Sequence, residues 1–199
     1  MVRTAWVLAT VGITTACSSG STRALSATPA ATPEGRIAQL AAMFDFERDV
    51  ITGEGWYTVK DPFTARLVRK RIEPVVHSSG RIYMRSIYRD DGWLFHDQVQ
   101  ARVGDRVLET AKVPSFDRRN SRRVLDGKFI GETIAFTDGA DNGILDAIAA
   151  EPALPVVVRF VGRDAVHTQE MSEDDKRRIA AGVELARLLR ARHTTASPR

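Results

Sequence analysis

Alternation of apolar and polar residues dominates the first two thirds of the chain. Phe44 and Phe46 alternate with acidic residues, and a second extended run begins at residues 56–59. Residues 80–88 and 93–103 alternate over longer stretches. Because successive side chains of a strand point to opposite faces, a period of two predicts half-buried β-strands in all four places.

Two turn signals join the longer runs. Asp90–Gly92 and the Gly104-Asp105 pair are typical of the tight turns that connect hairpin strands. They predict a continuous antiparallel meander between residues 80 and 113. Residues 128–136 (KFIGETIAF) predict a further strand.

Helical spacing replaces alternation at both ends of the domain. Residues 34–43 predict a short helix, and residues 138–151 predict another, for which Asp141 or Asn142 is the expected N-cap. The clearest helix is 172–192, which begins with a capping serine and three acidic residues and ends with arginines.

The strands that remain complete the predicted fold. Residues 154–161 form an apolar, β-branched run, which predicts a central strand covered on both faces. Residues 163–171 predict a last short strand or turn, and 64–76 is ambiguous. The order predicts an α+β fold: an antiparallel sheet or β-sandwich with a helix near the N-terminus and two C-terminal helices packed on one face or end.

Composition narrows the class of protein. The chain has 199 residues, a net charge of +4 and one cysteine, so an internal disulfide is excluded. No apolar run is long enough for a spanning helix. Basic clusters at 66–71, 118–123 and 176–178 are expected to be solvated; contact with anionic groups is the alternative.

The N-terminal residues predict export. Arg3 precedes a short apolar stretch, 5–13, which is followed by small residues and then by Cys17. This arrangement resembles the lipobox of bacterial lipoproteins. The resemblance implies cleavage before Cys17, acylation of that cysteine, and sorting to the outer membrane, because Ser18 rather than aspartate follows it. The alternative is an incidental Cys17 in a soluble periplasmic or secreted protein.

These expectations divide the chain into four parts. They are a signal peptide at 1–16, an acylated cysteine with a Ser/Thr/Ala/Pro-rich tether at 17–33, a single α+β domain at 34–192, and a frayed tail at 193–199. The expected partner is therefore the membrane, reached through the acyl anchor. Export argues against nucleic acid as a partner and leaves an envelope protein or an anionic glycan.

Sequence motifs for catalysis are absent from the chain. It contains no G-x-S-x-G, H-E-x-x-H or S-x-x-K. Asp138, Asp141 and Asn142 lack the other ligands of a calcium loop and are interpreted as a turn and helix cap. We therefore predict no cofactor, no metal site and no catalytic residue.

Scattered polar residues leave a hydrolase as an alternative. His77, His96 and His167 could converge with Glu109 or Glu132 to act in acid–base catalysis. A cluster in one pocket would support this hypothesis, and dispersed positions would argue against it. The expected role of these residues is structural.

A binding surface is the second functional hypothesis. Trp93, His96, Arg85, Glu109 and Glu132 are the candidate binding residues. Aromatic side chains around Trp93 could line a groove, and Arg85 is expected to pair with Glu109 or Glu132, because an unpaired buried charge is costly. Arg159 is expected to do the same.

The sequence thus predicts an envelope lipoprotein with a binding or structural role. Residues 93–97 (WLFHD), the run VVVRFVG and the serine-capped final helix resemble uncharacterised bacterial envelope proteins, a resemblance that implies no activity. The alternatives are a periplasmic hydrolase and an inhibitor or immunity-type binder of a protein. The latter predicts an exposed apolar or aromatic patch of several hundred Å² on the folded domain.

Overall fold

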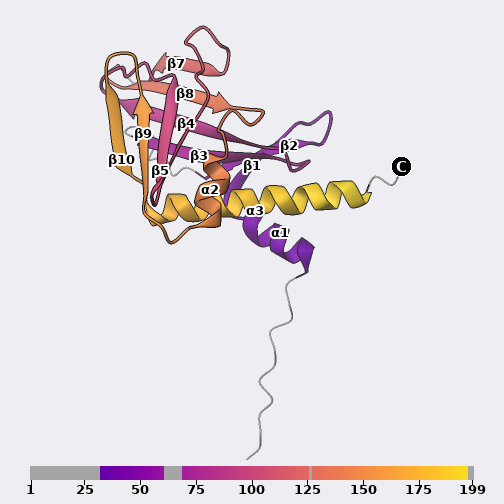
Figure 1. Cartoon of the computed structure of the whole chain (residues 1–199). Helices are drawn as coiled ribbons and strands as arrows, with labels where there is room; N and C mark the ends of the chain where they lie inside the picture. Colours follow the sequence, from indigo (N-terminus) through magenta and orange to yellow (C-terminus); the bar gives the residue numbers. More distant parts are fainter. Residues whose placement is uncertain (1–31, 61–68, 126, 197–199) are drawn as a thin grey trace, which may run out of the picture. The chain divides into compact units, whose positions relative to one another are not determined.

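Two antiparallel sheets and three helices make up residues 32–60, 69–125 and 127–196, the part of the chain that the computed structural model describes (Figure 1). The larger sheet, in spatial order, consists of β1 (Phe44–Arg48), β2 (Gly55–Val59), β3 (Arg69–His77), β4 (Ile82–Asp90), β8 (Ile130–Phe136) and β7 (Asn120–Val124). The smaller sheet consists of β10 (Val166–Glu170), β9 (Val156–Val161), β5 (Gln98–Val103) and β6 (Arg106–Glu109).

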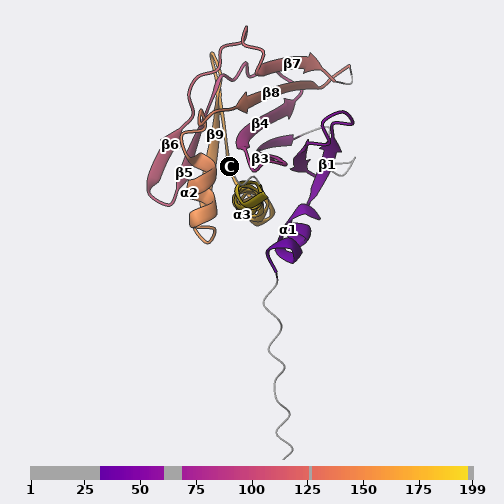
Figure 2. The same cartoon turned by 90° about the vertical axis from the view of Figure 1, so that its right-hand side faces the viewer.

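The helices pack against these sheets. They are α1 (Pro33–Ala41), α2 (Ile144–Ala150) and α3 (Glu173–Ala196). Figure 2 looks along α3 and shows this helix between the two sheets, with α2 beside it and α1 on the side of β1. The α+β class is confirmed, as are the helix near the N-terminus and the two helices toward the C-terminus.

One hydrophobic core joins the two sheets. Met84 and Ile134 of the larger sheet lie in the same buried cluster as Val99 and Phe160 of the smaller sheet, and Ile179 of α3 closes it. A second cluster lies beneath α1, where Ile37 and Leu40 meet Leu185 and Leu189 of α3. The apolar stripe of α3 therefore serves both clusters, which explains why this helix is the strongest helical signal in the sequence.

The predicted meander is wrong at its centre. β5 and β6 pair through the Gly104 turn as expected, but β4 pairs with β3 and β8, whereas β5 pairs with β6 and β9. The chain therefore leaves the larger sheet after Asp90 and enters the smaller sheet at Gln98. Residues 93–97 form no strand, because their backbone groups bind a buried side chain described below.

The predicted two-sided cover of residues 154–161 is also wrong. β9 lies between β10 and β5, so it is central, but its burial alternates along the strand. Arg159 is exposed and donates from Nε to the Thr168 hydroxyl at 3.2 Å. It reaches neither Glu109 nor Glu132, because the solvent-facing side of β9 carries it.

The helix termini differ in detail from the prediction. Gly143, with φ of 78°, occupies the N-cap of α2, so neither Asp141 nor Asn142 does. Ser172 accepts from the N–H of Asp175 at 3.1 Å, as expected of an N-cap at α3. That helix continues to Ala196 and so includes residues that we expected to fray.

Two parts of the sequence analysis fall outside the described residues. The leader, Cys17 and most of the tether lie there, and so do residues 61–68, whose neighbours from Arg69 onward form β3. None of the described helices is long and apolar enough to cross a membrane.

Candidate functional site

A buried carboxylate organises the segment that leaves the larger sheet. Glu132 lies on β8, and its side chain has an exposed fraction of 0%. Its Oε1 accepts the backbone N–H groups of Leu94 at 2.7 Å and Phe95 at 2.8 Å, and its Oε2 accepts that of His96 at 2.8 Å. The carboxylate thus binds the donors that a neighbouring strand would otherwise satisfy, which is why no strand forms there.

The imidazole of His96 completes this network. Nδ1 of His96 lies 3.0 Å from Oε2 of Glu132, and Nε2 lies 2.9 Å from Oγ of Ser86 on β4. Burial acts to raise the pKa of Glu132, but the hydrogen bonds from the His96 ring and from the N–H groups of Phe95 and Leu94 hold this pKa below its ordinary value. Glu132 is therefore ionised at neutral pH, and Nδ1 of His96 donates to it.

Ser86, His96 and Glu132 are connected in the order of a serine hydrolase triad. However, each of the three residues has an exposed fraction of 0%. A nucleophile has to reach the reacting carbon of a substrate, and Ser86 lies inside the core at the middle of β4. The burial therefore favours a structural role, in which the network holds the backbone of residues 94–96.

The network directs two aromatic side chains outward. Phe95 adopts a φ of 55°, the left-handed region that non-glycine residues rarely enter. Leu94 and His96 point into the core, whereas Trp93 and Phe95 are 39% and 44% exposed. Their rings stack at 5.6 Å between centroids and 17° between planes. A stacked, partly exposed pair of aromatic rings therefore lies on the segment whose backbone the buried carboxylate binds.

Arg122 of β7 adds a cation to this pair. Its guanidinium carbon lies 5.6 Å from the centroid of the Phe95 ring, within the range of a cation–π contact. Its Nη2 donates to the backbone oxygen of His96 at 3.0 Å, and its Nε lies 3.7 Å from Oε2 of Glu132. We call Trp93, Phe95 and Arg122 the aromatic–cation surface. The hydrogen bond and the ion pair both hold Arg122 against the ordered segment.

A polar pocket of about 260 Å³ adjoins this surface. We call it the basic pocket; its lining residues are Phe95, Asp97, Lys112, Ser115, Arg122, Val161, Gly162 and Arg163. Three of these side chains are cationic and one is a carboxylate. They come from both sheets and from the loops between them, so the pocket exists only in the folded domain.

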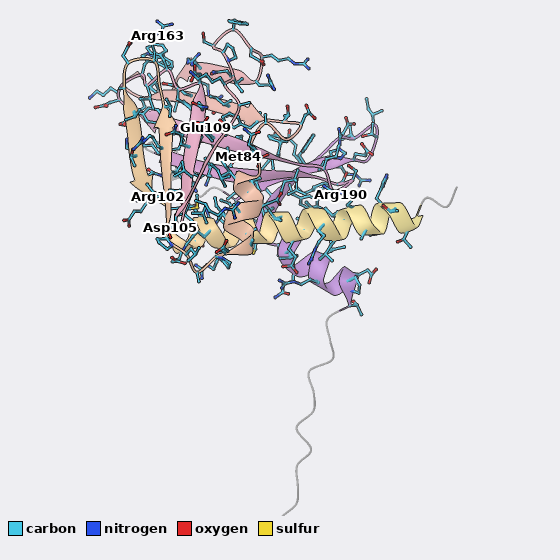
Figure 3. The ribbon with its side chains drawn as sticks, viewed as in Figure 1. Met84, Arg102, Asp105, Glu109, Arg163 and Arg190 are labelled. Atoms are coloured by element: carbon cyan, nitrogen blue, oxygen red, sulfur yellow. The ribbon has the colours of Figure 1, made fainter. Side chains whose placement is uncertain are left out.

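The other candidate residues lie elsewhere. Arg85 pairs with Glu73 of β3, with Nε 2.7 Å from Oε1, rather than with Glu109 or Glu132. Glu109 is exposed at the end of β6, where its Oε2 accepts from Nε2 of Gln100 at 3.2 Å (Figure 3). The structure therefore brings together Trp93, His96 and Glu132 and separates Arg85 and Glu109 from them.

The remaining histidines are separate from this network. His77 contacts the Trp56 ring at 4.6 Å and lies 3.5 Å from the carboxylate of Glu54. Burial lowers the pKa of His77, and the charge of Arg81 acts in the same direction. His167 packs beside Tyr88, with ring centroids 5.8 Å apart. The convergence required by the hydrolase hypothesis is limited to His96 and Glu132.

The three cationic residues of the basic pocket are not among the predicted site residues. Arg122 falls in the basic cluster 118–123, which was interpreted as a solvated face, and β7 itself was not predicted. Lys112 and Arg163 carried no local signal. Among the described side chains, no group of three or more His, Cys, Asp or Glu is placed to hold a metal ion.

Comparison with known proteins yields no relative. The chain matches no protein-family model, no curated protein and no solved structure.

Proposed function

We propose that the protein is an envelope-anchored binding protein that recognises its partner through the aromatic–cation surface. The observation that carries this proposal is the outward display of Trp93 and Phe95 by a segment that Glu132 holds in a strained conformation. Left-handed backbone at a non-glycine residue costs on the order of 1–3 kcal/mol and persists only where surrounding contacts enforce it. Such strain is concentrated at functional sites.

The composition of the surface supports binding. Ligand sites are typically lined by aromatic side chains together with a few precisely placed polar or charged groups, which is the composition of this surface. Phe116, which follows the pocket residue Ser115, is 90% exposed. The two stacked, partly exposed rings and the ordered guanidinium of Arg122 provide a preformed contact area, so little ordering of these groups is needed when a partner binds.

The proposed anchor fits the position of the domain in the chain. Thr32 caps α1, which begins at Pro33, so residues 18–32 separate the domain from Cys17. Fifteen residues span at most about 50 Å at 3.3–3.6 Å each. An acylated Cys17 would therefore keep the N-terminal end of the domain within that distance of the membrane.

Substitution of Cys17 by serine tests the anchor. In bacteria that express the full-length chain and receive a clickable fatty acid, we expect label on the wild-type protein and sedimentation with the outer membrane. Cys17→Ser should abolish both, because no other thiol exists in the chain. An unlabelled wild-type protein in the periplasmic fraction would show that Cys17 is incidental and that the binder is diffusible.

Photo-crosslinking tests the binding surface. A photoreactive residue at position 116, in the bacterium that produces the protein, is expected to give a discrete adduct. The additional substitution Trp93→Ala should weaken that adduct several-fold, because it removes the stacked platform. Position 107 on β6, where Val107 is 68% exposed, is the matched control. Equal adducts at both positions, or none at position 116, would contradict a binding role for this surface.

A further inference from the structure

The charges of the basic pocket define what it can hold. Lys112 and Arg163 are exposed, and Arg122 reaches the pocket from β7 while its Nη2 is bound to the backbone oxygen of His96. Arginine and lysine at one small pocket favour an acidic group, to which they donate charge-assisted hydrogen bonds. The ligand of this pocket therefore carries a carboxylate or a phosphate.

Asp97 restricts that ligand further. Its carboxylate lines the same pocket and is only partly exposed. A carboxylate accepts hydrogen bonds and repels other anions, so it disfavours a ligand whose every edge is charged. A ligand with hydroxyl groups beside its acid can donate to Asp97 while the cations bind the acid. Ser115 adds a hydroxyl that can donate or accept.

The stacked rings indicate the shape of the ligand. Trp93 and Phe95 are stacked with nearly parallel planes, at 17°, and Phe95 also lines the pocket, so the partly exposed rings and the charged groups are adjacent. The face of an aromatic ring carries a negative electrostatic potential, and it attracts the weakly positive C–H groups on one face of a sugar ring. The pocket, at about 260 Å³, is smaller than drug-sized sites and suits a single ring.

We infer that the surface binds an acidic carbohydrate, with one sugar ring against Trp93 and Phe95 and its acid group between Lys112, Arg122 and Arg163. This inference rests on the proposed binding function and names the ligand class for the same surface. A dense polyanion is disfavoured by Asp97, and an uncharged glycan cannot make charge-assisted hydrogen bonds to Lys112 and Arg163. A protein partner is disfavoured because the basic pocket adjoins the aromatic–cation surface. This pocket is polar, and its carboxylate can accept hydrogen bonds from hydroxyl groups.

Calorimetric titration of the full-length chain tests the ligand class. The probes are trigalacturonic acid, maltotriose as its uncharged counterpart, and inositol hexakisphosphate as a dense polyanion. We expect the galacturonate to bind more tightly than either comparison compound. Lys112→Ala and Arg163→Ala should each weaken that binding about tenfold, since each removes a charge-assisted contact. Trp93→Ala should weaken it by a similar factor.

Arg102→Ala is the matched control, because Arg102 is an exposed arginine on β5, at the opposite end of the smaller sheet from Arg163 (Figure 3). It should leave binding unchanged. The inference is overturned if the galacturonate does not bind, if maltotriose or inositol hexakisphosphate binds as tightly, or if Arg102→Ala has the same effect as Arg163→Ala. If one of these results is obtained but the adduct at position 116 still forms, the carbohydrate is rejected as the ligand and the proposed binding function stands.

Discussion

Replacement of Glu132 by glutamine is expected to lower the free energy of unfolding by about 3–5 kcal/mol, since removing one member of a fully buried charged network leaves its partners unsatisfied. Glutamine has the same size but only one acceptor oxygen. Its NH₂ group would face the backbone N–H groups that now donate to the carboxylate from Leu94, Phe95 and His96. Urea denaturation of the wild type and of Glu132→Gln measures the difference.

Glu109→Gln is the matched control for this experiment. Glu109 is exposed on β6, so the same chemical change there should alter the free energy of unfolding by less than about 0.5 kcal/mol. Equal effects of the two substitutions would show that the network around Glu132 does not stabilise the fold. If Glu132→Gln lowers the stability but leaves crosslinking at position 116 unchanged, the network around Glu132 is not needed for binding by the aromatic–cation surface.

The pH dependence of stability gives the same network a second readout. The pKa of Glu132 is lower in the folded protein than in the unfolded chain. The unfolded state therefore binds more protons in the acid range, so the contribution of Glu132 is fully present above its ordinary pKa. It is lost as the pH falls through the folded pKa. Glu132→Gln should reduce the dependence of the free energy of unfolding on pH below about pH 5.

Truncation of Phe160 to alanine is expected to lower the free energy of unfolding by about 3–5 kcal/mol, the usual cost of removing a buried phenylalanine ring. Phe160 lies on β9 with an exposed fraction of 0%. Its ring contacts those of Tyr88, His96 and His167 at centroid distances of 6.1, 5.6 and 6.3 Å. It therefore connects the smaller sheet to β4 and to the segment that carries the aromatic–cation surface.

Thermal unfolding measures this effect. For a chain of this size each kcal/mol shifts the midpoint by roughly 2–4 °C, so a decrease of about 6–20 °C is expected for Phe160→Ala. Phe116→Ala removes an identical ring from a position that is 90% exposed and should leave the midpoint almost unchanged. A small shift for Phe160→Ala would mean that the two sheets do not depend on this contact.

The fold was predictable where the signal is local. Alternation along Ile82–Asp90 predicts the strand that forms there, and Met84, Ser86 and Tyr88 on one of its faces are buried. A strand also forms at Phe44–Arg48, but only Phe44 is buried there and Phe46 is 43% exposed. The start of α3 was equally predictable, since Ser172 and the acidic residues of the first turn lie within a few residues of one another. β7 was missed because its five residues are mostly polar and exposed.

The site was only partly predictable for the opposite reason. Trp93, His96 and Glu132 were named as candidates, but the hydrogen bonds that relate them join residues 36–38 positions apart. The alternation of residues 93–97 resembles that of a strand, but the carboxylate of Glu132 binds three of their backbone N–H groups, and Arg122 binds the backbone oxygen of His96. Arg122, Lys112 and Arg163 belong to separate parts of the sequence, so no local pattern could group them.

By itself, then, the sequence determined the α+β class, the approximate positions of most elements and the N-terminal cap of its long helix, because these depend on neighbours a few residues apart. The export signal and the acylation of Cys17 remain predictions of the same local kind. Only the tertiary structure decided which sheet each strand joins and which polar groups Glu132 satisfies. It also decided that a buried network presents Trp93 and Phe95 beside a cationic pocket, since each of these depends on contacts between distant parts of the chain.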